Sequence, residues 1–294
     1  NKGVNWSLQI SNTNKDLKAV CFIDKMNCIA VGKSGLILKS ENTGSSWTTL
    51  KSFIKSDLIS VNFPYIKTGY TSGYNGTILK TTDCGNSWTE QISGTSSPLF
   101  CINFLNENTG FAGGFNIILK TTNGGLNWIE QNINISPVSQ IMGISFLNDS
   151  NNIIAVSNSP SGNIYKTTNG GSNWNKYSLN LTFLYGGAVD LVKSMKFLNE
   201  NTGFVITDFG TILKTVNSGV NWTQNSIFRP ENEKQGIMSD LSIIDSNKIH
   251  ITGGGCSDFT SSDGGASWSV NIGNKKDVRA NYFINENTGY CVGE

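Results

Sequence analysis

Seven tryptophans divide the chain at nearly regular intervals, and this spacing constrains the fold more than any other feature. They lie 41, 41, 40, 46, 48 and 46 residues apart, at Trp6, Trp47, Trp88, Trp128, Trp174, Trp222 and Trp268. The last six end a recurring segment, S/T-x-D/N-x-G-x-x-W, and residues 1–6 (NKGVNW) are the tail of a seventh copy. Such a period is typical of a closed array of small β-sheets. We therefore expect one all-β domain over residues 1–294.

Residues 99–131 show how one repeat should fold. The apolar run LFCINFL is followed by the turn NENTG, a second short strand FAGG, a connector at Phe115-Asn116 and a third strand IILKT. The turn TNGG then leads into a fourth strand, NWIEQ. Four short strands joined by Asn/Gly turns predict an antiparallel meander sheet. The near-continuous apolar runs predict sheets that are buried on both faces, and no segment has a sustained helical period.

The recurring segment has a structural explanation. Asp83, Asp263 and the Asn at 42, 123, 169 and 217 can accept backbone N–H bonds within the turn. The Gly two positions later tolerates a positive φ. The Trp should pack on a neighbouring strand, with its N–H reaching a turn carbonyl. Because four of these six positions carry Asn, a metal site is not expected.

The two chain ends predict how the ring closes. Residues 281–294 (NYFINENTGYCVGE) match the first two strands of a repeat, and residues 1–10 match its turn and fourth strand. We expect a seven-bladed β-propeller of four-stranded antiparallel blades, closed by both termini. The third strand of this shared blade is missing, so we expect the native chain to continue past Glu294 with a segment resembling xGTILKT.

The repeated segment, together with FLNENTGF (104–111 and 197–204), GTILKTT (76–82) and GTILKT (210–215), resembles the photosystem II stability/assembly factor-like family. These are seven-bladed BNR/Asp-box propellers. The resemblance covers the whole chain and implies an assembly or interaction role outside the cytoplasm. Family members contact a membrane-protein client through an arginine-rich patch. This chain has only Arg229 and Arg279, so that patch cannot be present as described.

Several other functions are excluded or disfavoured. Only 15% of residues are charged and the net charge is +1, which argues against nucleic-acid binding. No apolar run approaches the roughly 18 residues of a membrane-spanning helix. Asp-box sialidases hold a carboxylate with three arginines, which lysine replaces poorly. The two arginines of this chain cannot form such a triad, which excludes a sialidase. Xyloglucanase-like enzymes need two propellers around a cleft. We find no catalytic motif and no sign of a cofactor or metal.

Histidine and cysteine also point away from metal chemistry. His250 is the only histidine, and we expect it to be a packing or surface residue near a strand edge. The six cysteines follow no metal-binding spacing. Cys21 and Cys28 flank one expected hairpin turn, where they could form a disulfide or remain free thiols.

Two inter-blade loops are longer than the others and are candidates for a partner-binding surface. From Trp88 to Phe104 is 16 residues, but from Trp174 to Phe197 is 23 and from Trp222 to Ile244 is 22. The long loops read LNLTFLYGGAVDLV (179–192) and NSIFRPENEKQGIM (225–238). Loops on a rigid scaffold often carry function, although simple insertions are an alternative. The candidate partner-binding residues are Phe183, Tyr185, Asp190, Phe228, Arg229, Glu231, Glu233 and Lys234.

The connectors within blades supply a second candidate surface. Tyr74, Phe115 and Phe209 should lie around the mouth of the central channel, on the face opposite the Trp-containing turns. Aromatic side chains beside amides suit sugar stacking or a peptide anchor, and they could equally plug the channel. We expect a non-enzymatic protein-interaction scaffold. A glycan-binding module or degenerate glycoside hydrolase using the aromatic rim, and a purely structural module, remain alternatives.

Overall fold

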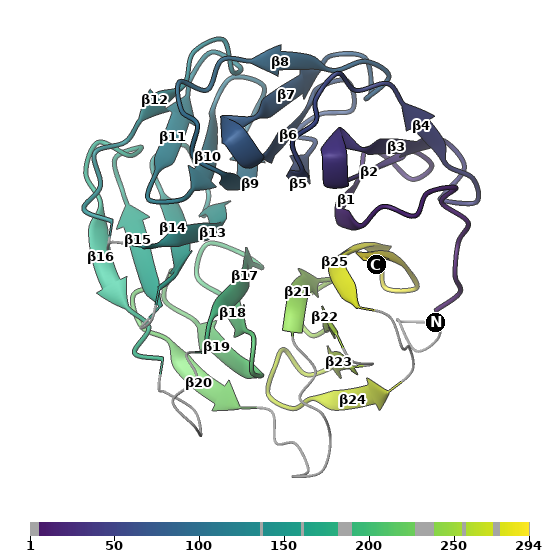
Figure 1. Ribbon diagram of the computed structural model, residues 1–294. Coiled ribbons are helices and arrows are strands. Elements are labelled where there is room, and N and C mark those ends of the chain that lie inside the picture. The colour runs from purple at the N-terminus through teal and green to yellow at the C-terminus, as the bar shows by residue number, and fades with distance from the viewer. Residues whose placement is uncertain are drawn as a thin grey trace.

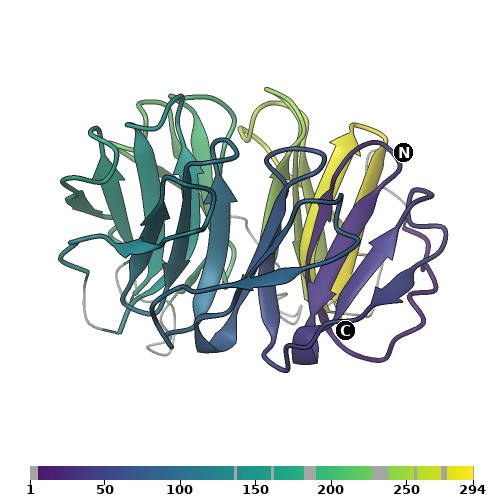
Figure 2. The ribbon, with the colours of Figure 1, turned by 90° about the horizontal axis from the view of Figure 1, so that it is seen from above.

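The computed structural model describes residues 6–135, 138–159, 162–181, 190–226, 238–254, 257–272 and 277–293. Within these residues the chain forms seven antiparallel sheets around a central axis (Figures 1 and 2). Six sheets have four strands each, and the seventh has two. The only helical elements described are two short 3-10 turns, η1 (Lys33–Gly35) and η2 (Tyr74–Gly76). The all-β propeller predicted from the Trp spacing is therefore confirmed.

Strands follow the repeat in chain order. The first sheet consists of β1 (Leu17–Phe22), β2 (Cys28–Gly32), β3 (Ile37–Ser40) and β4 (Thr48–Leu50). The second consists of β5 (Leu58–Asn62), β6 (Gly69–Gly73), β7 (Ile78–Thr81) and β8 (Thr89–Gln91). The third consists of β9 (Leu99–Phe104), β10 (Gly110–Gly114), β11 (Ile118–Thr121) and β12 (Ile129–Glu130). The fourth sheet consists of β13 (Gln140–Phe146), β14 (Ile153–Asn158), β15 (Asn163–Thr167) and β16 (Asn175–Ser178). The fifth consists of β17 (Val192–Phe197), β18 (Gly203–Thr207), β19 (Thr211–Thr215) and β20 (Thr223–Ser226). The sixth consists of β21 (Met238–Ile243), β22 (Ile249–Gly253), β23 (Ser257–Ser261) and β24 (Ser269–Ile272). The two-stranded sheet pairs β25 (Val278–Asn285) with β26 (Thr288–Gly293).

The core lies between neighbouring sheets, as the apolar strands predict. Every residue is buried in the second strands β2, β6, β10, β18 and β22. At one position of the third strands, isoleucine recurs in five sheets with at most 1% of its surface exposed: Ile37, Ile78, Ile118, Ile164 and Ile212. Ile78, for example, belongs to the cluster that includes Leu99 and Ile102 of the next sheet. Burial of this kind is the main stabilising contribution in a propeller.

The Asp-box turns form the hydrogen bonds that the sequence predicts. In all six complete copies the Asp or Asn side-chain oxygen accepts the N–H four residues later, at 2.8–3.0 Å. The Ser or Thr that opens each turn accepts the glycine N–H at 2.8–3.0 Å, and that glycine has a φ between 75° and 94°. These residues are structural.

The predicted hydrogen bond from each Trp N–H to a turn carbonyl is only partly correct. Trp88 and Trp222 donate their indole N–H to the carbonyls of Gly85 and Gly219 at 3.1 Å. The indole N–H groups of Trp128, Trp174 and Trp268 are buried without a hydrogen-bond partner among the described residues. Packing of the indole ring on its blade is therefore the more general contribution of these tryptophans.

Closure of the ring differs from the expectation. Strands β25 and β26 are present, but residues 6–10 form no strand, so the predicted fourth strand is wrong for this part of the chain. The count of seven four-stranded blades is not confirmed, because six are seen. A strand at the outer position of a blade needs an ordered third strand beside it, and no described strand pairs with the outer edge of β26.

His250 and the cysteines have structural surroundings. His250 is fully buried in the second strand β22, so the surface alternative is wrong and the packing alternative is correct. Cys21, Cys28, Cys84, Cys101 and Cys291 are free thiols, so Cys21 and Cys28 do not form a disulfide. Burial raises the pKa of Cys21 to about 11 and the pKa of Cys101 to about 12.

Candidate functional site

The two faces of the disc carry different turns. On one face, each Asp-box turn is joined to the turn between the first and second strands of its own blade. Gly124 N–H, for example, donates to the Asn108 carbonyl at 2.9 Å, and the same bond recurs in the other five complete blades. The opposite face carries the connectors between second and third strands, including η1 and η2. We call it the connector face.

Connectors on this face contact the next blade. Ser34 N–H donates to Asp57 Oδ1 at 2.9 Å, Asn116 exchanges two hydrogen bonds with Ser139, and Met238 N–H donates to the Asp208 carbonyl. Ser34, Asn75 and Asn116 each have a φ of 55–57°, in the left-handed region. The connectors therefore form a linked set of tight turns around the axis.

Each innermost strand carries a β-bulge near its start, which sequence reasoning did not predict. The pairing register shifts by one residue at the same place in all seven inner strands (β1, β5, β9, β13, β17, β21 and β25), which surround the axis in Figure 1. A bulged residue makes no ladder pair, and its side chain is redirected. We name these residues the bulge ring: Lys18, Ile59, Phe100, Met142, Lys193, Ser239 and Arg279.

Burial distinguishes the bulge ring from its surroundings. All seven of its members are partly or well exposed. The residue before the bulge is buried in six of the seven strands. Since neighbouring inner strands are in contact around the whole circle, the ring follows the mouth of the channel. Its members are thus less buried than their neighbours, although Met142 also packs against an apolar cluster of the core.

The bulge ring is divided into two arcs. Ile59, Phe100 and Met142 are consecutive and apolar. The remaining members, Lys193, Ser239, Arg279 and Lys18, are also consecutive, and three of these four are cations. Lateral contacts between successive inner strands hold the two arcs opposite each other. The mouth can therefore contact an apolar group on one side and an anionic group on the other.

Two of the three cations of the arc are paired with carboxylates. Asp16 accepts both Lys18 Nζ at 3.3 Å and Lys33 Nζ at 2.6 Å, and Lys193 Nζ lies 2.7 Å from Asp208 Oδ1. The hydrogen bond from Lys33 lowers the pKa of the Asp16 carboxyl group. Burial, and then the nearby Arg279, lower the pKa of Lys193.

The predicted aromatic rim lies beside this ring, and Tyr74 is its most exposed member. Tyr74 is 44% exposed and meets the ring of Phe100 edge-on, with 6.5 Å between centroids. Phe115 is half-buried and forms an isolated β-bridge with Gln140. Phe209 is half-buried, and its N–H donates to Asp190 Oδ1 at 3.0 Å. Phe100 extends the aromatic surface inward from Tyr74.

The predicted loop residues fall mostly outside the described part of the chain. Phe183, Tyr185, Phe228, Arg229, Glu231, Glu233 and Lys234 lie outside the described residues. Asp190 is described, with only 2% of its surface exposed. Its carboxylate holds the connector at Phe209 and is therefore engaged within the chain.

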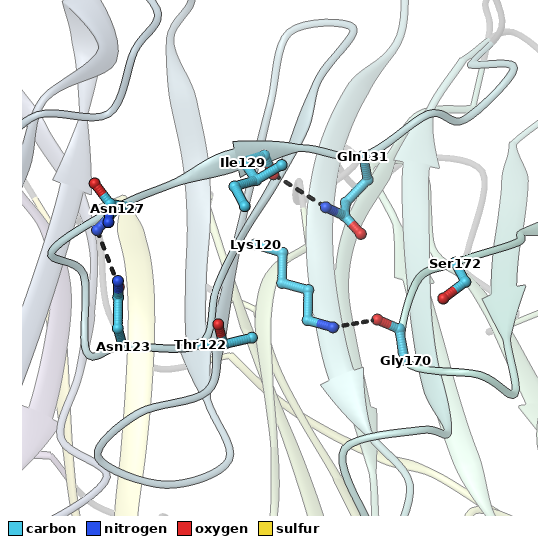
Figure 3. A pocket seen from close by; sticks show the side chains of 8 residues that line it. All are labelled: Lys120, Thr122, Asn123, Asn127, Ile129, Gln131, Gly170 and Ser172. Atoms are coloured by element: carbon cyan, nitrogen blue, oxygen red, sulfur yellow. Dashed lines mark hydrogen bonds between the residues drawn. The ribbon is translucent and has the colours of Figure 1, made fainter.

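A shallow pocket of about 320 Å³ lies between two Asp-box turns on the other face (Figure 3). Its wall contains Lys120 and the amide side chains of Asn123, Asn127 and Gln131. Lys120 Nζ already donates to the Gly170 carbonyl at 2.6 Å, and Gln131 donates to the Ile129 carbonyl. Its only ionisable side chain is thus used to join two blades, which gives the pocket no acid–base group.

The described ranges carry neither a cluster suited to metal binding nor a helix suited to membrane insertion. No group of three or more His, Cys, Asp or Glu side chains there could hold a metal ion. Within the same ranges, no helix has the length and apolar character needed to cross a membrane. Asp258 has a pKa raised by burial to about 6, but it lies in the third strand β23, between blades.

These features define an Asp-box β-propeller whose connector face combines aromatic, apolar and cationic side chains. The sequence model of the family described as Photosynthesis system II assembly factor YCF48 matches residues 40–194, just over half of the chain. The chain belongs to this family, as its repeated segments predicted. Comparison with curated protein sequences gives no match.

Solved structures show the same fold at low sequence identity. "YCF48 bound to D1 peptide" has a TM-score of 0.77 and 20% identity, covering 98% of this chain and 91% of that one. "YCF48 from Cyanidioschyzon merolae" has a TM-score of 0.72 and 18% identity, covering 96% and 93%. The GH74 enzyme of Niastella koreensis has a TM-score of 0.65 and 19% identity, covering 87% of this chain but 45% of the enzyme.

Proposed function

We propose that this chain is a non-enzymatic protein-binding scaffold that holds an extended segment of a partner protein at the bulge ring. The observation that carries the proposal is the division of this ring into an apolar arc and a cationic arc. The solved structure "YCF48 bound to D1 peptide" supports a peptide-like segment as the ligand. Family membership supports an assembly role.

The chemistry of the ring specifies the type of segment. Phe100 and Tyr74 provide aromatic surface for an apolar side chain, and aromatic residues often dominate the energy of protein interfaces. Arg279 is exposed and carries a guanidinium group, the kind of cation that pairs well with carboxylates. We therefore expect a partner segment that places an apolar side chain at one arc and an acidic group at the other.

Site-specific photocrosslinking in the native source tests this proposal. A photoreactive phenylalanine derivative replaces Phe100 or Tyr74, and a matched control replaces Leu126, which is 73% exposed in an Asp-box turn. We expect one recurrent protein to be crosslinked from positions 74 and 100, but not from 126. Arg279→Glu should reduce this crosslink. Equal crosslinking from all three positions would contradict binding at the connector face.

A glycan-binding function is the second candidate. It is favoured by the exposed ring of Tyr74, which is adjacent to the amide of Asn75, because sugars often bind to an aromatic face beside an amide. Glycan-array binding that is lost in Tyr74→Ala, without a protein crosslink, would favour this candidate. Among the carboxylates near the mouth, Asp16, Asp57, Asp190 and Asp208 are engaged in ion pairs or hydrogen bonds, which does not favour a glycosidase.

We also propose that β25 and β26 belong to a seventh, closing blade and that the protein acts outside the cytoplasm. In support of the closing blade, Trp6 meets Phe283 edge-on at 5.8 Å, as Trp88 meets Phe63 at 5.9 Å and Trp222 meets Phe197 at 6.1 Å. Loss of stability in Trp6→Ala would test this role. Cell fractionation of the native source tests the location, for which the support is family resemblance.

A further inference from the structure

We propose that the pocket between the Asp-box turns of the third and fourth blades binds a neutral sugar (Figure 3). The pocket lies on the face opposite the bulge ring, so this is a second site and goes beyond the function proposed above. Its evidence is the uncommitted hydrogen-bonding groups in its wall, the residues that distinguish it from the same place in other blades, and a lining without carboxylates.

The first wall contributes two amide side chains. Asn123 Oδ1 accepts the backbone N–H of Asn127 at 3.0 Å, as in every complete Asp-box turn. Within the described residues, Asn123 Nδ2 and the side-chain amide of Asn127 form no hydrogen bond. In three other turns a serine at the position of Asn127 binds the outer atom of the Asp or Asn: Ser46 with Asn42, Ser87 with Asp83 and Ser267 with Asp263. The third blade therefore leaves two amides available to a ligand.

The rest of the wall adds acceptors and donors. Gln131 donates its Nε2 to the Ile129 carbonyl at 3.0 Å, which leaves Oε1 as an acceptor. Ser172 donates its hydroxyl to the Asn169 carbonyl at 3.1 Å, so its oxygen can still accept. Lys120 Nζ donates to the Gly170 carbonyl at 2.6 Å and retains two further protons, since an ammonium group has three. The pocket thus offers both kinds of hydrogen-bonding group.

The residues of this wall differ from those at the same place between other blades. Between the second and third blades, Gln91 keeps the amide of Gln131, but Leu126 stands at the position of Ser172. Between the fourth and fifth blades these two positions are Tyr177 and Val220. Among the complete blades, a side-chain amide on one side and a hydroxyl group on the other occur together only between the third and fourth. The combination is a property of this pocket and not of the repeat.

The lining chemistry favours a neutral sugar. A hydroxyl group both donates and accepts, so sugar hydroxyls can satisfy the mixed groups of the wall. None of the lining residues carries a carboxylate, and the one ammonium group, that of Lys120, is already bound to a carbonyl. Ile129 is 65% exposed and offers apolar surface to the C–H groups of a sugar ring. The volume of about 320 Å³ lies near the lower end of the range for ligand pockets, so we expect one or two sugar units.

Saturation-transfer difference NMR on the intact 294-residue chain tests this proposal. The probes are cellobiose, maltose, lactose, xylobiose and N,N′-diacetylchitobiose, and we expect at least one to bind. Ser172→Leu and Asn127→Ser introduce the residues that Leu126 and Ser87 supply in other Asp-box turns, so the turn accommodates both. Each should weaken binding at least about tenfold, through lost hydrogen bonds. Asn173→Ser, in the fourth-blade turn, is the matched control and should leave the affinity unchanged.

Four results would overturn the proposal. The first is no binding of any of these disaccharides at millimolar concentration, and the second is equal affinity in the parent and both pocket variants. The third is binding that is lost in Tyr74→Ala but kept in Ser172→Leu, which would place the sugar on the connector face. The fourth is binding of triglycine, but of no sugar, with the same dependence on Ser172 and Asn127, which would assign the pocket to a peptide. Photocrosslinking from Phe100 and Tyr74 is read independently, so either proposal can fail alone.

Discussion

The interface between the sixth blade and β25–β26 contains two ionisable groups, the buried His250 and the half-buried Asp258, whose pH dependences should cancel between about pH 4 and 6. Asp258 occupies the third-strand position that is isoleucine in five other blades, and burial raises its pKa to about 6. His250 occupies the position of Tyr70, Phe111 and Phe204, and burial lowers its pKa to about 4. Neither nitrogen of His250 has a hydrogen-bond partner within the described residues.

The direction of each effect follows from proton linkage. Because the pKa of Asp258 is raised on folding, its contribution to the free energy of unfolding is fully present below pH 3.8 and is lost as the pH rises to about 6. Because the pKa of His250 is lowered on folding, its contribution to the free energy of unfolding is fully present above pH 6.5 and is lost as the pH falls to about 4. Between about pH 4 and 6, the folded state carries a proton on Asp258 and the unfolded state carries one on His250. Both states then bind the same number of protons at these two sites.

Single substitutions should separate the two effects. A shift of about two pKa units corresponds to about 3 kcal/mol, which we reduce to about 2 kcal/mol because Asp258 is partly exposed. Asp258→Asn should therefore raise the free energy of unfolding by about 2 kcal/mol at pH 7 and leave it unchanged near pH 3. As the pH falls to 4, His250 costs the parent about 3 kcal/mol in the free energy of unfolding, and His250→Phe should abolish this loss.

Urea denaturation followed by tryptophan fluorescence, at half-unit steps from pH 3 to 8, measures both variants against the parent. Subtraction of the parent removes contributions from other groups, including the nearby Cys291 and Asp240. Asp149→Asn is the control of opposite sign, because backbone N–H groups of Asn152 and Asn151 lower the pKa of Asp149. A gain for Asp258→Asn that is the same at pH 3 and pH 7 would refute the reasoning, because the pKa of Asp258 would then be the same in the folded and unfolded states.

The remaining predictions concern the turns, the ring closure and the thiols. Thr81→Ala removes the acceptor of the Gly85 N–H and should reduce the free energy of unfolding by about 1–3 kcal/mol in urea, whereas Thr81→Ser should retain most of it. Trp6→Ala should lower the Tm and increase hydrogen exchange in β25; an unchanged exchange rate would contradict the closing-blade assignment. Iodoacetamide at pH 8 should modify the half-buried Cys84 before the buried Cys101, whose pKa is raised to about 12; peptide mass spectrometry reports the order.

The sequence predicted the elements that depend on local chemistry. The segment from Thr121 to Trp128 contains its own hydrogen-bond donors and acceptors, so the turn could be derived from residue types alone. Strand alternation and turn spacing similarly predicted β9 to β12 within a few residues. Each of these features is complete within one repeat and needs no information about neighbouring blades.

Features that depend on partners could not be predicted in this way. Phe100 is redirected by a one-residue register shift against β10, which an apolar run such as LFCINF does not reveal. The burial of Asp190 depends on the Phe209 N–H, 19 residues away. Residues 7–10 have the composition of a fourth strand, but strand formation needs a neighbouring strand on which to pair.

The bulge ring separates the residues that hold the fold together from residues that can be exchanged on its surface. Because its members make no ladder pair, one position in each inner strand can change while the blade cores and the Asp-box turns remain constant. Seven such positions surround one axis, so a ligand would be specified by the order of the side chains around the ring as well as by their identity. Gene duplication of one repeat, followed by substitution at a single position per copy, would be sufficient to generate new binding specificities on an unchanged framework.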